Sequence, residues 1–204
     1  MYNDIEDFQQ KYPTKEAKVT ALKTMSNEEI DELIDLCQTV QGKLWYQRFK
    51  KSVTIFRYEL KDAWGIPVRE IEVIDGPKMF VRFASDAGLE LYMLSMGKGE
   101  FTEEIRLQRE DLMRIREILD NDRLFEQEEL ERAHGIAVLD GYIQTIEISC
   151  KGRYIKARGA NMDYCEGDFE HCFHTNLMIR VIKSIGEILI PLGVLEECFS
   201  LTRE

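Results

Sequence analysis

Residues 140–161 constrain the fold more than any other part of the chain, because they hold two β-rich runs joined by a short glycine-containing turn. The runs cover residues 140–150 and 153–161, and Lys151-Gly152 separates them. Glycine can adopt the positive φ that tight hairpin turns demand. The segment therefore predicts a β-hairpin.

Apolar residues also recur with a period of two between residues 52 and 108, which is typical of strands. Turn-forming residues interrupt this pattern, among them Asp75-Gly76-Pro77 and Gly97-Lys98-Gly99. Connections this short favour antiparallel neighbours, since parallel strands need longer crossovers. The pattern predicts a meander of strands at residues 53–60, 68–74, 79–84, 89–95 and 101–107.

Apolar residues at helical spacing occupy several other segments. Ser26 and Glu29 form the Ser-x-x-Glu pattern of a capping box, which predicts a helix over residues 27–41 that ends or bends at Gly42. Further helices are expected at residues 110–119, 176–190 and 194–201. Apolar residues cover most of the circumference of the helix expected at residues 176–190, so this helix should be the most buried.

These elements together predict the α+β class, with an antiparallel β-meander and hairpin packed against a few helices. Residues 1–24 are polar and lack a sustained period, so they predict an N-terminal arm or a short helix, and residues 25–204 predict a single domain. Strands followed by a helix occur in residues 52–120 and again in residues 138–200. This order suggests two similar halves, although they share little residue identity.

The charge of the chain bears on its partners. It carries 38 acidic and 27 basic residues, a net charge of −11. Such a charge opposes binding to phosphate backbones or anionic lipid, so nucleic acid is disfavoured as a partner and a basic protein is favoured. Residues 45–51 mix aromatic and basic side chains, and nucleic-acid binding through residues 43–51 and the hairpin, with an affinity that falls steeply with salt, is a third hypothesis. In so acidic a chain they predict aromatic rings that enter the core and lysines that stay in water.

The cysteines and the apolar segments bear on location. The chain holds 5 cysteines, an odd number in a chain too long to need disulfides, and reduced thiols in a cytoplasm are expected. Its acidic beginning lacks the pattern of a secretory signal. The most apolar late stretch, residues 188–195, is far shorter than the roughly 20 residues that span a bilayer. The sequence thus predicts a cytoplasmic protein without a membrane segment.

One segment, residues 163–174, concentrates side chains that can bind metal or act as nucleophiles. Zinc takes about four N, S or O ligands in a tetrahedral arrangement. The spacing here lacks the Cys-x2-Cys and His-x3-His pairs of zinc sites, and it favours a loop that leads into the next helix. A cysteine nucleophile beside a histidine is a further alternative. The candidate metal ligands are Cys165, His171, Cys172 and His174.

The hairpin offers a candidate binding surface. Strand alternation places Lys156 and Arg158 on one face with Tyr154, and Arg153 and Ile155 on the other. A basic and aromatic patch of this kind can bind an anion or an acidic partner. The commoner arrangement for such charges is the solvated face of a sheet whose other side packs on helices.

The pattern Asp140-Gly141, alternating isoleucines, a turn, and Gly159-Ala160-Asn161 before an apolar helix resembles a group of uncharacterised bacterial proteins over residues 138–190. Those proteins have an Asp-Gly-x-x-Trp strand, a glycine-containing turn, a second strand that ends in Gly-x-Asn, and a C-terminal helix. This chain has Gln144 or Thr145 where that pattern places tryptophan, and it lacks the proline that commonly follows the asparagine. The resemblance implies an α+β fold and a bacterial or phage source, and it carries no activity.

No segment of the sequence presents a nucleophile with its base and orienting group, a phosphate-binding loop or a recognised metal spacing. We therefore expect a non-enzymatic, cytoplasmic protein that binds another protein and uses no cofactor. The net charge of −11 favours a partner with a basic surface. An acidic inhibitor or immunity-type role is one form of this hypothesis. The alternative is a metal-dependent or cysteine hydrolase that uses residues 163–174.

Overall fold

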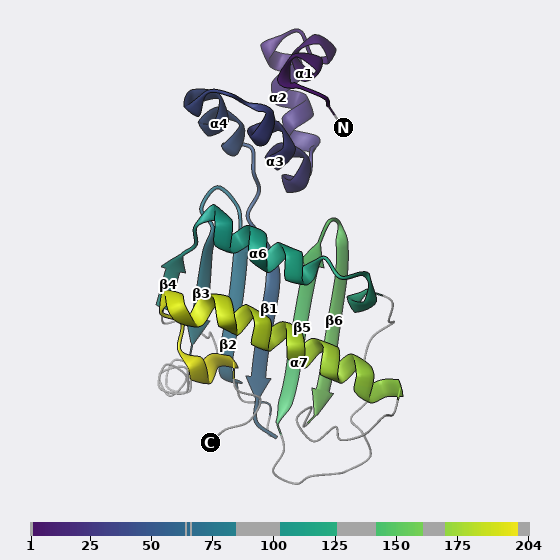
Figure 1. Ribbon diagram of the computed structural model, residues 1–204, viewed down its shortest axis with the longest axis vertical. Helices are drawn as coiled ribbons and strands as arrows, with labels where there is room; N and C mark the ends of the chain where they lie inside the picture. Colours follow the sequence, from purple (N-terminus) through teal and green to yellow (C-terminus); the bar gives the residue numbers. More distant parts are fainter. Residues whose placement is uncertain are drawn as a thin grey trace. The chain divides into compact units, whose positions relative to one another are not determined.

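The computed structural model describes residues 2–63, 65, 67–84, 103–125, 142–160 and 170–199, with the backbone alone at residue 160 and residues 170–176. The chain divides into two compact units (Figure 1). The helical unit comprises Met1–Val53 and Asp75–Lys78, and the sheet unit comprises Thr54–Ile74 and Met79–Glu204. The first division of the chain thus falls near residue 53, whereas the sequence predicted one near residue 25.

The described part of the helical unit contains α1 (Ile5–Lys11), α2 (Lys15–Thr24), α3 (Asn27–Leu36) and α4 (Val40–Gln47). Phe8 of α1 and Leu22 of α2 are fully buried in one apolar cluster with Ile30 and Leu33 of α3. Residues 1–24 therefore form helices that contribute to a core. The prediction of a polar arm is wrong for this segment, and the alternative of a short helix is closer to the structure.

The predicted helix over residues 27–41 is two helices. The capping box begins α3 as predicted, with reciprocal hydrogen bonds between Ser26 and Glu29. The backbone at Cys37 is extended, and the Thr39 hydroxyl begins α4 by accepting a hydrogen bond from the Gly42 N–H at 3.1 Å. A second local cap thus interrupts an apolar stripe that continues along the sequence.

A buried lysine joins distant segments of the helical unit. Lys50 Nζ lies 2.8 Å from Asp75 Oδ1 and 3.2 Å from Asp31 Oδ1, and the side chains of Lys50 and Asp75 are 5% and 0% exposed. The prediction that the lysines stay in water is wrong for Lys50 and right for the exposed Lys51. Asn27 adds a second connection, since its side chain donates to the Lys51 carbonyl at 2.5 Å and accepts from the Lys51 N–H at 2.9 Å.

Among the described residues, six strands form one sheet in the order β4-β3-β2-β1-β5-β6. They are β1 (Val53–Lys61), β2 (Pro67–Asp75), β3 (Phe80–Ala84), β4 (Glu103–Arg106), β5 (Ile143–Cys150) and β6 (Arg153–Ala160). The hairpin of β5 and β6 is confirmed, and β5 pairs antiparallel with β1 so that Phe56 lies opposite Ile148. The predicted strand at residues 89–95 lies outside the described residues.

Two helices, α6 (Arg109–Leu119) and α7 (Glu170–Leu189), contact each other and cross one face of the sheet (Figure 1). Ile115 of α6 and Ile182 of α7 are fully buried in one cluster with Phe56 and Tyr58 of β1. The predicted α+β fold is therefore confirmed. The helix expected at residues 176–190 begins earlier, at Glu170. The described residues also form short 3-10 helices, which are η1 (Asp122–Leu124), η3 (Ile190–Leu192) and η4 (Glu196–Phe199).

None of the helices that the structure describes has the length and apolar character that crossing a membrane requires. The order of elements follows the expected repetition, since β1 to β4 precede α6, and β5 and β6 precede α7. In the sheet, however, β5 of the second group pairs with β1 of the first, so both groups form a single layer.

The hairpin turn depends on a glycine. Lys151 and Gly152 have φ of 49° and 73°, and a Cβ added at Gly152 would meet nothing within 4 Å. An alanine there would fit in space but would still have to adopt the left-handed conformation, which costs an L-residue about 1–2 kcal/mol. We expect Gly152→Ala to lower the free energy of unfolding by about that amount in urea denaturation. Lys151→Gly is the control, and it should be nearly neutral because relief of strain offsets the loss of an exposed ion pair with Asp120.

Candidate functional site

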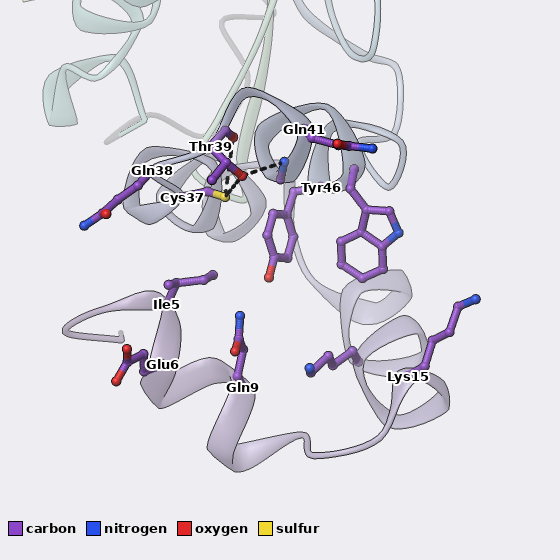
Figure 2. A pocket seen from close by; sticks show the side chains of 12 residues that line it. Ile5, Glu6, Gln9, Lys15, Cys37, Gln38, Thr39, Gln41 and Tyr46 are labelled. Atoms are coloured by element: carbon purple, nitrogen blue, oxygen red, sulfur yellow. Dashed lines mark hydrogen bonds between the residues drawn. The ribbon is translucent and has the colours of Figure 1, made fainter.

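A pocket of about 820 Å³ opens among the helices of the helical unit (Figure 2). This volume lies within the range of roughly 300–1,000 Å³ typical of small-molecule sites. The side chains that give the pocket its chemistry are aromatic, aliphatic and charged, and they are Trp45, Tyr46, Ile5, Lys15, Lys18 and Glu6. The sequence predicted no pocket here and offered Trp45 and Tyr46 only as part of a candidate nucleic-acid surface.

Tyr46 is the most buried polar side chain of this pocket. It is 5% exposed, and its hydroxyl points into the pocket without a hydrogen bond to the described residues (Figure 2). Burial, and next the neighbouring Cys37, raise the pKa of the Tyr46 phenol. The hydroxyl therefore stays protonated at neutral pH and can donate a hydrogen bond to a ligand.

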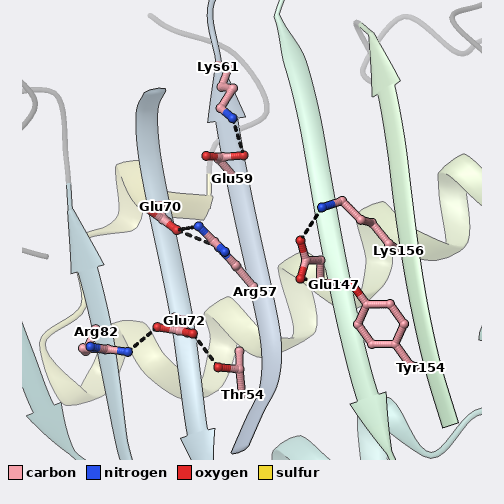
Figure 3. A network of polar contacts seen from close by, with 10 residues as sticks. All are labelled: Thr54, Arg57, Glu59, Lys61, Glu70, Glu72, Arg82, Glu147, Tyr154 and Lys156. Carbon is pink, nitrogen blue, oxygen red and sulfur yellow. Dashed lines mark hydrogen bonds and ion pairs between the residues drawn. The ribbon is translucent and has the colours of Figure 1, made fainter. Parts of the chain in front are cut away.

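The second candidate surface is the face of the sheet opposite α6 and α7, which carries charged side chains (Figure 3). Strand alternation explains it, because the residues between the buried positions of each strand point to the other face. On β1 and β2, Arg57 donates to Glu70 through both Nε, at 2.7 Å, and Nη2. Glu72 accepts hydrogen bonds from Arg82 and Thr54. These charges are paired within the sheet.

The face continues on β5 and β6 in a group that we call the hairpin patch, which consists of Glu147, Tyr154, Lys156 and Arg158. Glu147 accepts hydrogen bonds from Lys156 Nζ at 2.8 Å and from the Tyr154 hydroxyl at 3.2 Å (Figure 3). Tyr154 is 62% exposed. Arg158 is exposed and forms no ion pair with the described residues. The structure thus brings the three predicted binding residues together on one exposed face.

The electrostatics differ between the two halves of this face. Burial raises the pKa of Glu70, and Arg57 offsets this only in part. Burial lowers the pKa of Arg57, yet its carboxylate neighbours, Glu70 foremost, outweigh burial and raise it. The raised pKa of Glu70 favours its neutral form, whereas the raised pKa of Arg57 favours its charged form. The contact through two guanidinium nitrogens stabilises the ionised pair.

Glu147 has the opposite shift from Glu70. Burial by itself would raise the pKa of Glu147, but the hydrogen bond and charge of Lys156, with Arg57 and Tyr154, outweigh burial and lower the pKa. The folded pKa is therefore below the usual value of 4.5. Ionised Glu147 stabilises the fold above that pH, and the contribution is lost as the pH falls through the folded pKa.

We therefore expect Glu147→Gln to be less stable than the unchanged protein at neutral pH, by less than about 1 kcal/mol because the ion pair is open to solvent. The difference should shrink as the pH falls below 4.5 and as salt is added. Urea denaturation at several pH values measures it. A difference that does not change with pH would show that the shape of the side chain matters rather than its charge.

The hairpin patch lies at one edge of the sheet. β6 is the last strand in the sheet order, and no other strand of the described residues pairs with its outer edge. Eight residues, Arg153–Ala160, form this strand. A long edge strand presents backbone N–H and C=O groups that another strand can pair with.

The predicted metal ligands cannot be placed as a group. Cys165 lies outside the described residues, and His171, Cys172 and His174 belong to the first turns of α7, where only the backbone is described. Elsewhere, the described residues contain no cluster of three or more histidine, cysteine or acidic side chains able to hold a metal. The metal hypothesis for residues 165–174 stays a prediction, which elemental analysis of the purified protein would test.

Sequence reasoning found Tyr154, Lys156 and Arg158 of the hairpin patch, and it missed Glu147 and the pocket. The patch follows from strand alternation within one hairpin, which is a local property. The pocket combines side chains of α1, α2 and α4, whose mutual placement depends on how the helices pack. The one local signal was the aromatic pair Trp45 and Tyr46 in a polar background.

The chemistry of these surfaces is inferred from their own geometry and charges. Comparison with known protein families, curated proteins and solved structures found no match for this chain.

Proposed function

We propose that the protein acts, without catalysis, by binding an extended segment of a partner protein along β6. The observation that carries the proposal is Arg158, which is exposed, free of ion pairs with the described residues, and in line with Tyr154 and Lys156 on an edge strand. A charged side chain in this position has an unused capacity to pair with a ligand.

The edge position supports this mode of binding. A peptide that adds to a sheet edge obtains main-chain hydrogen bonds from the strand, and its alternate side chains meet one face of the sheet. Residues 154, 156 and 158 alternate in the same way, and all three are exposed. Main-chain pairing would supply part of the affinity, and this row of side chains would supply the specificity.

The patch is also held in place before any partner arrives. Glu147 accepts hydrogen bonds from both Tyr154 and Lys156, so two of the three side chains are already oriented. Less conformational freedom is then lost on binding. Tyrosine and arginine are moreover the residue types that most often dominate interface energies, together with tryptophan.

The local charge indicates the chemistry of the bound segment. Lys156 and Arg158 contribute two positive charges and Glu147 one negative charge, so the hairpin patch has a net charge of about +1 when all three are ionised. The whole chain, in contrast, has a net charge of −11. An acidic residue in the bound segment would pair with Arg158, whatever the charge of the remaining partner surface.

Selection from a library of random peptides tests the proposal directly. We expect the enriched peptides to carry an acidic residue beside β-forming residues, and to lose at least about tenfold in affinity for Arg158→Glu, because an attractive charge pair becomes a repulsive one. The matched control is Arg106→Glu, since Arg106 is also exposed on an edge strand, β4, at the opposite end of the sheet. Peptides that bind both variants equally well, or no enrichment, would contradict the proposal.

A further inference from the structure

We propose that the pocket of the helical unit binds a small aromatic carboxylate. The inference concerns the helical unit alone, and it does not depend on what binds at β6. Three observations carry it: a rigid aromatic wall, a tyrosine hydroxyl that faces the pocket without a hydrogen bond to the described residues, and an excess of positive charge that forms no ion pair with those residues.

The aromatic wall consists of Trp45 and Tyr46 on α4. Their ring centroids lie 5.0 Å apart with an interplanar angle of 80°, and Trp45 also packs edge-on against Phe49, with centroids 5.2 Å apart. Tyr46 further contacts Phe8 of α1. These contacts restrict the rings, so a planar ligand would meet a preformed surface.

The hydroxyl of Tyr46 gives the pocket a specific polar contact. A hydroxyl on the wall of a largely apolar pocket can donate one hydrogen bond to a ligand and so fix the orientation of that ligand. This side chain is 5% exposed and makes no hydrogen bond with the described residues, and Figure 2 shows its hydroxyl directed into the pocket. A ligand oxygen that accepts from this hydroxyl would replace solvent as its hydrogen-bond partner.

The charges at the pocket select an anion. Lys15 and Lys18 of α2 line the pocket, and neither forms an ion pair with the described residues. Glu6 lies at the same pocket and is likewise unpaired, so the two lysines leave a net positive charge of about one. In a chain with a net charge of −11, this local excess favours a ligand with a single negative charge.

Size decides between a small molecule and an isolated ion. A pocket of about 820 Å³ has room for a fused two-ring ligand, whereas an inorganic anion would leave the aromatic wall unused. A carboxylate joined to an aromatic ring uses all three features together. Its ring packs on the wall, and its oxygens reach the hydroxyl and the ammonium groups.

Isothermal titration calorimetry with 2-naphthoate tests the inference, and 2-naphthamide serves as the neutral control of nearly the same shape. We expect 2-naphthoate to bind with a dissociation constant between about 10 µM and 1 mM, which is reasonable for a ligand of this size. The amide should bind at least about fivefold more weakly, because it lacks the charge. Absence of binding by the carboxylate at 1 mM, or equal affinity for the two ligands, would overturn the inference.

Two variants separate the contributions of the hydroxyl and the lysines. Tyr46→Phe should weaken 2-naphthoate about 3- to 30-fold without lowering the melting temperature of the free protein, because the lost hydroxyl forms no hydrogen bond with the described residues. Lys18→Gln should reduce the preference for the carboxylate over the amide, whereas Lys23→Gln, on the same helix but outside the pocket, should not. A lower melting temperature of Tyr46→Phe with unchanged affinity would assign the hydroxyl a structural role and overturn the proposal.

Discussion

Lys50→Ala should lower the free energy of unfolding of the helical unit by about 3–5 kcal/mol, the usual cost of removing one member of a buried ion pair. The lysine places a cation 2.8 Å from the Asp75 carboxylate, which is 0% exposed, and it also contacts Asp31. Taking the cation away leaves a charge in an environment of low polarity. Trp45 fluorescence during urea denaturation, in a Trp64→Phe background, reports on this unit because Trp45 packs against its core.

The adjacent lysine is the matched control. Lys51 is exposed, and its bonds to Asn27 come from its backbone, so Lys51→Ala keeps them. Its effect should stay within about 0.5 kcal/mol. The double variant Lys50→Met with Asp75→Asn should lose less stability than the sum of its two single variants, because neither charge remains buried alone. Equal losses for Lys50→Ala and Lys51→Ala would contradict the assignment of Lys50 as a structural residue.

Phe8→Ala should also lower the free energy of unfolding by about 3–5 kcal/mol, the range for truncating a fully buried phenylalanine. Phe8 is 0% exposed. Its ring has three aromatic neighbours, Tyr2, Tyr12 and Tyr46, at centroid distances of 5.3, 5.1 and 6.0 Å. Alanine would leave a cavity among them and remove α1 from the core.

The control for Phe8→Ala is Val40→Ala, because Val40 is an apolar residue of the same unit that is 76% exposed. It should change the free energy of unfolding by less than about 0.5 kcal/mol. The same Trp45 fluorescence assay measures both variants. If Phe8→Ala were as harmless as Val40→Ala, the first 24 residues would behave as the loose arm that their composition suggests.

Elements that depend on short-range patterns were predictable from the sequence. The capping box of Ser26 and Glu29 places the start of α3, and the Lys151-Gly152 turn places the hairpin of β5 and β6. The alternation of Tyr154, Lys156 and Arg158 with buried Ile155 and Ala157 follows directly from strand geometry. Each of these features is decided by residues a few positions apart.

Features that join distant segments were not predictable. The sequence around Lys50 does not distinguish it from a solvated lysine. Only the approach of Asp31 and Asp75 makes its burial possible. The break between α3 and α4 lies within a continuous apolar stripe, where the Thr39 cap prevails over the periodicity. Residues 1–24 look polar overall, yet they place Phe8 and Leu22 in a shared core.

The sequence by itself determined the α+β class, most strand positions, the hairpin and the shared face of Tyr154, Lys156 and Arg158, because hydrophobic period, turn residues and helix caps act locally. The tertiary structure decided that β5 pairs with β1, that β6 lies at an edge, and that a pocket forms around Tyr46. These properties depend on which surfaces pack together. Packing depends on burial, strand pairing and shape across the whole unit. No short stretch of residues carries that information.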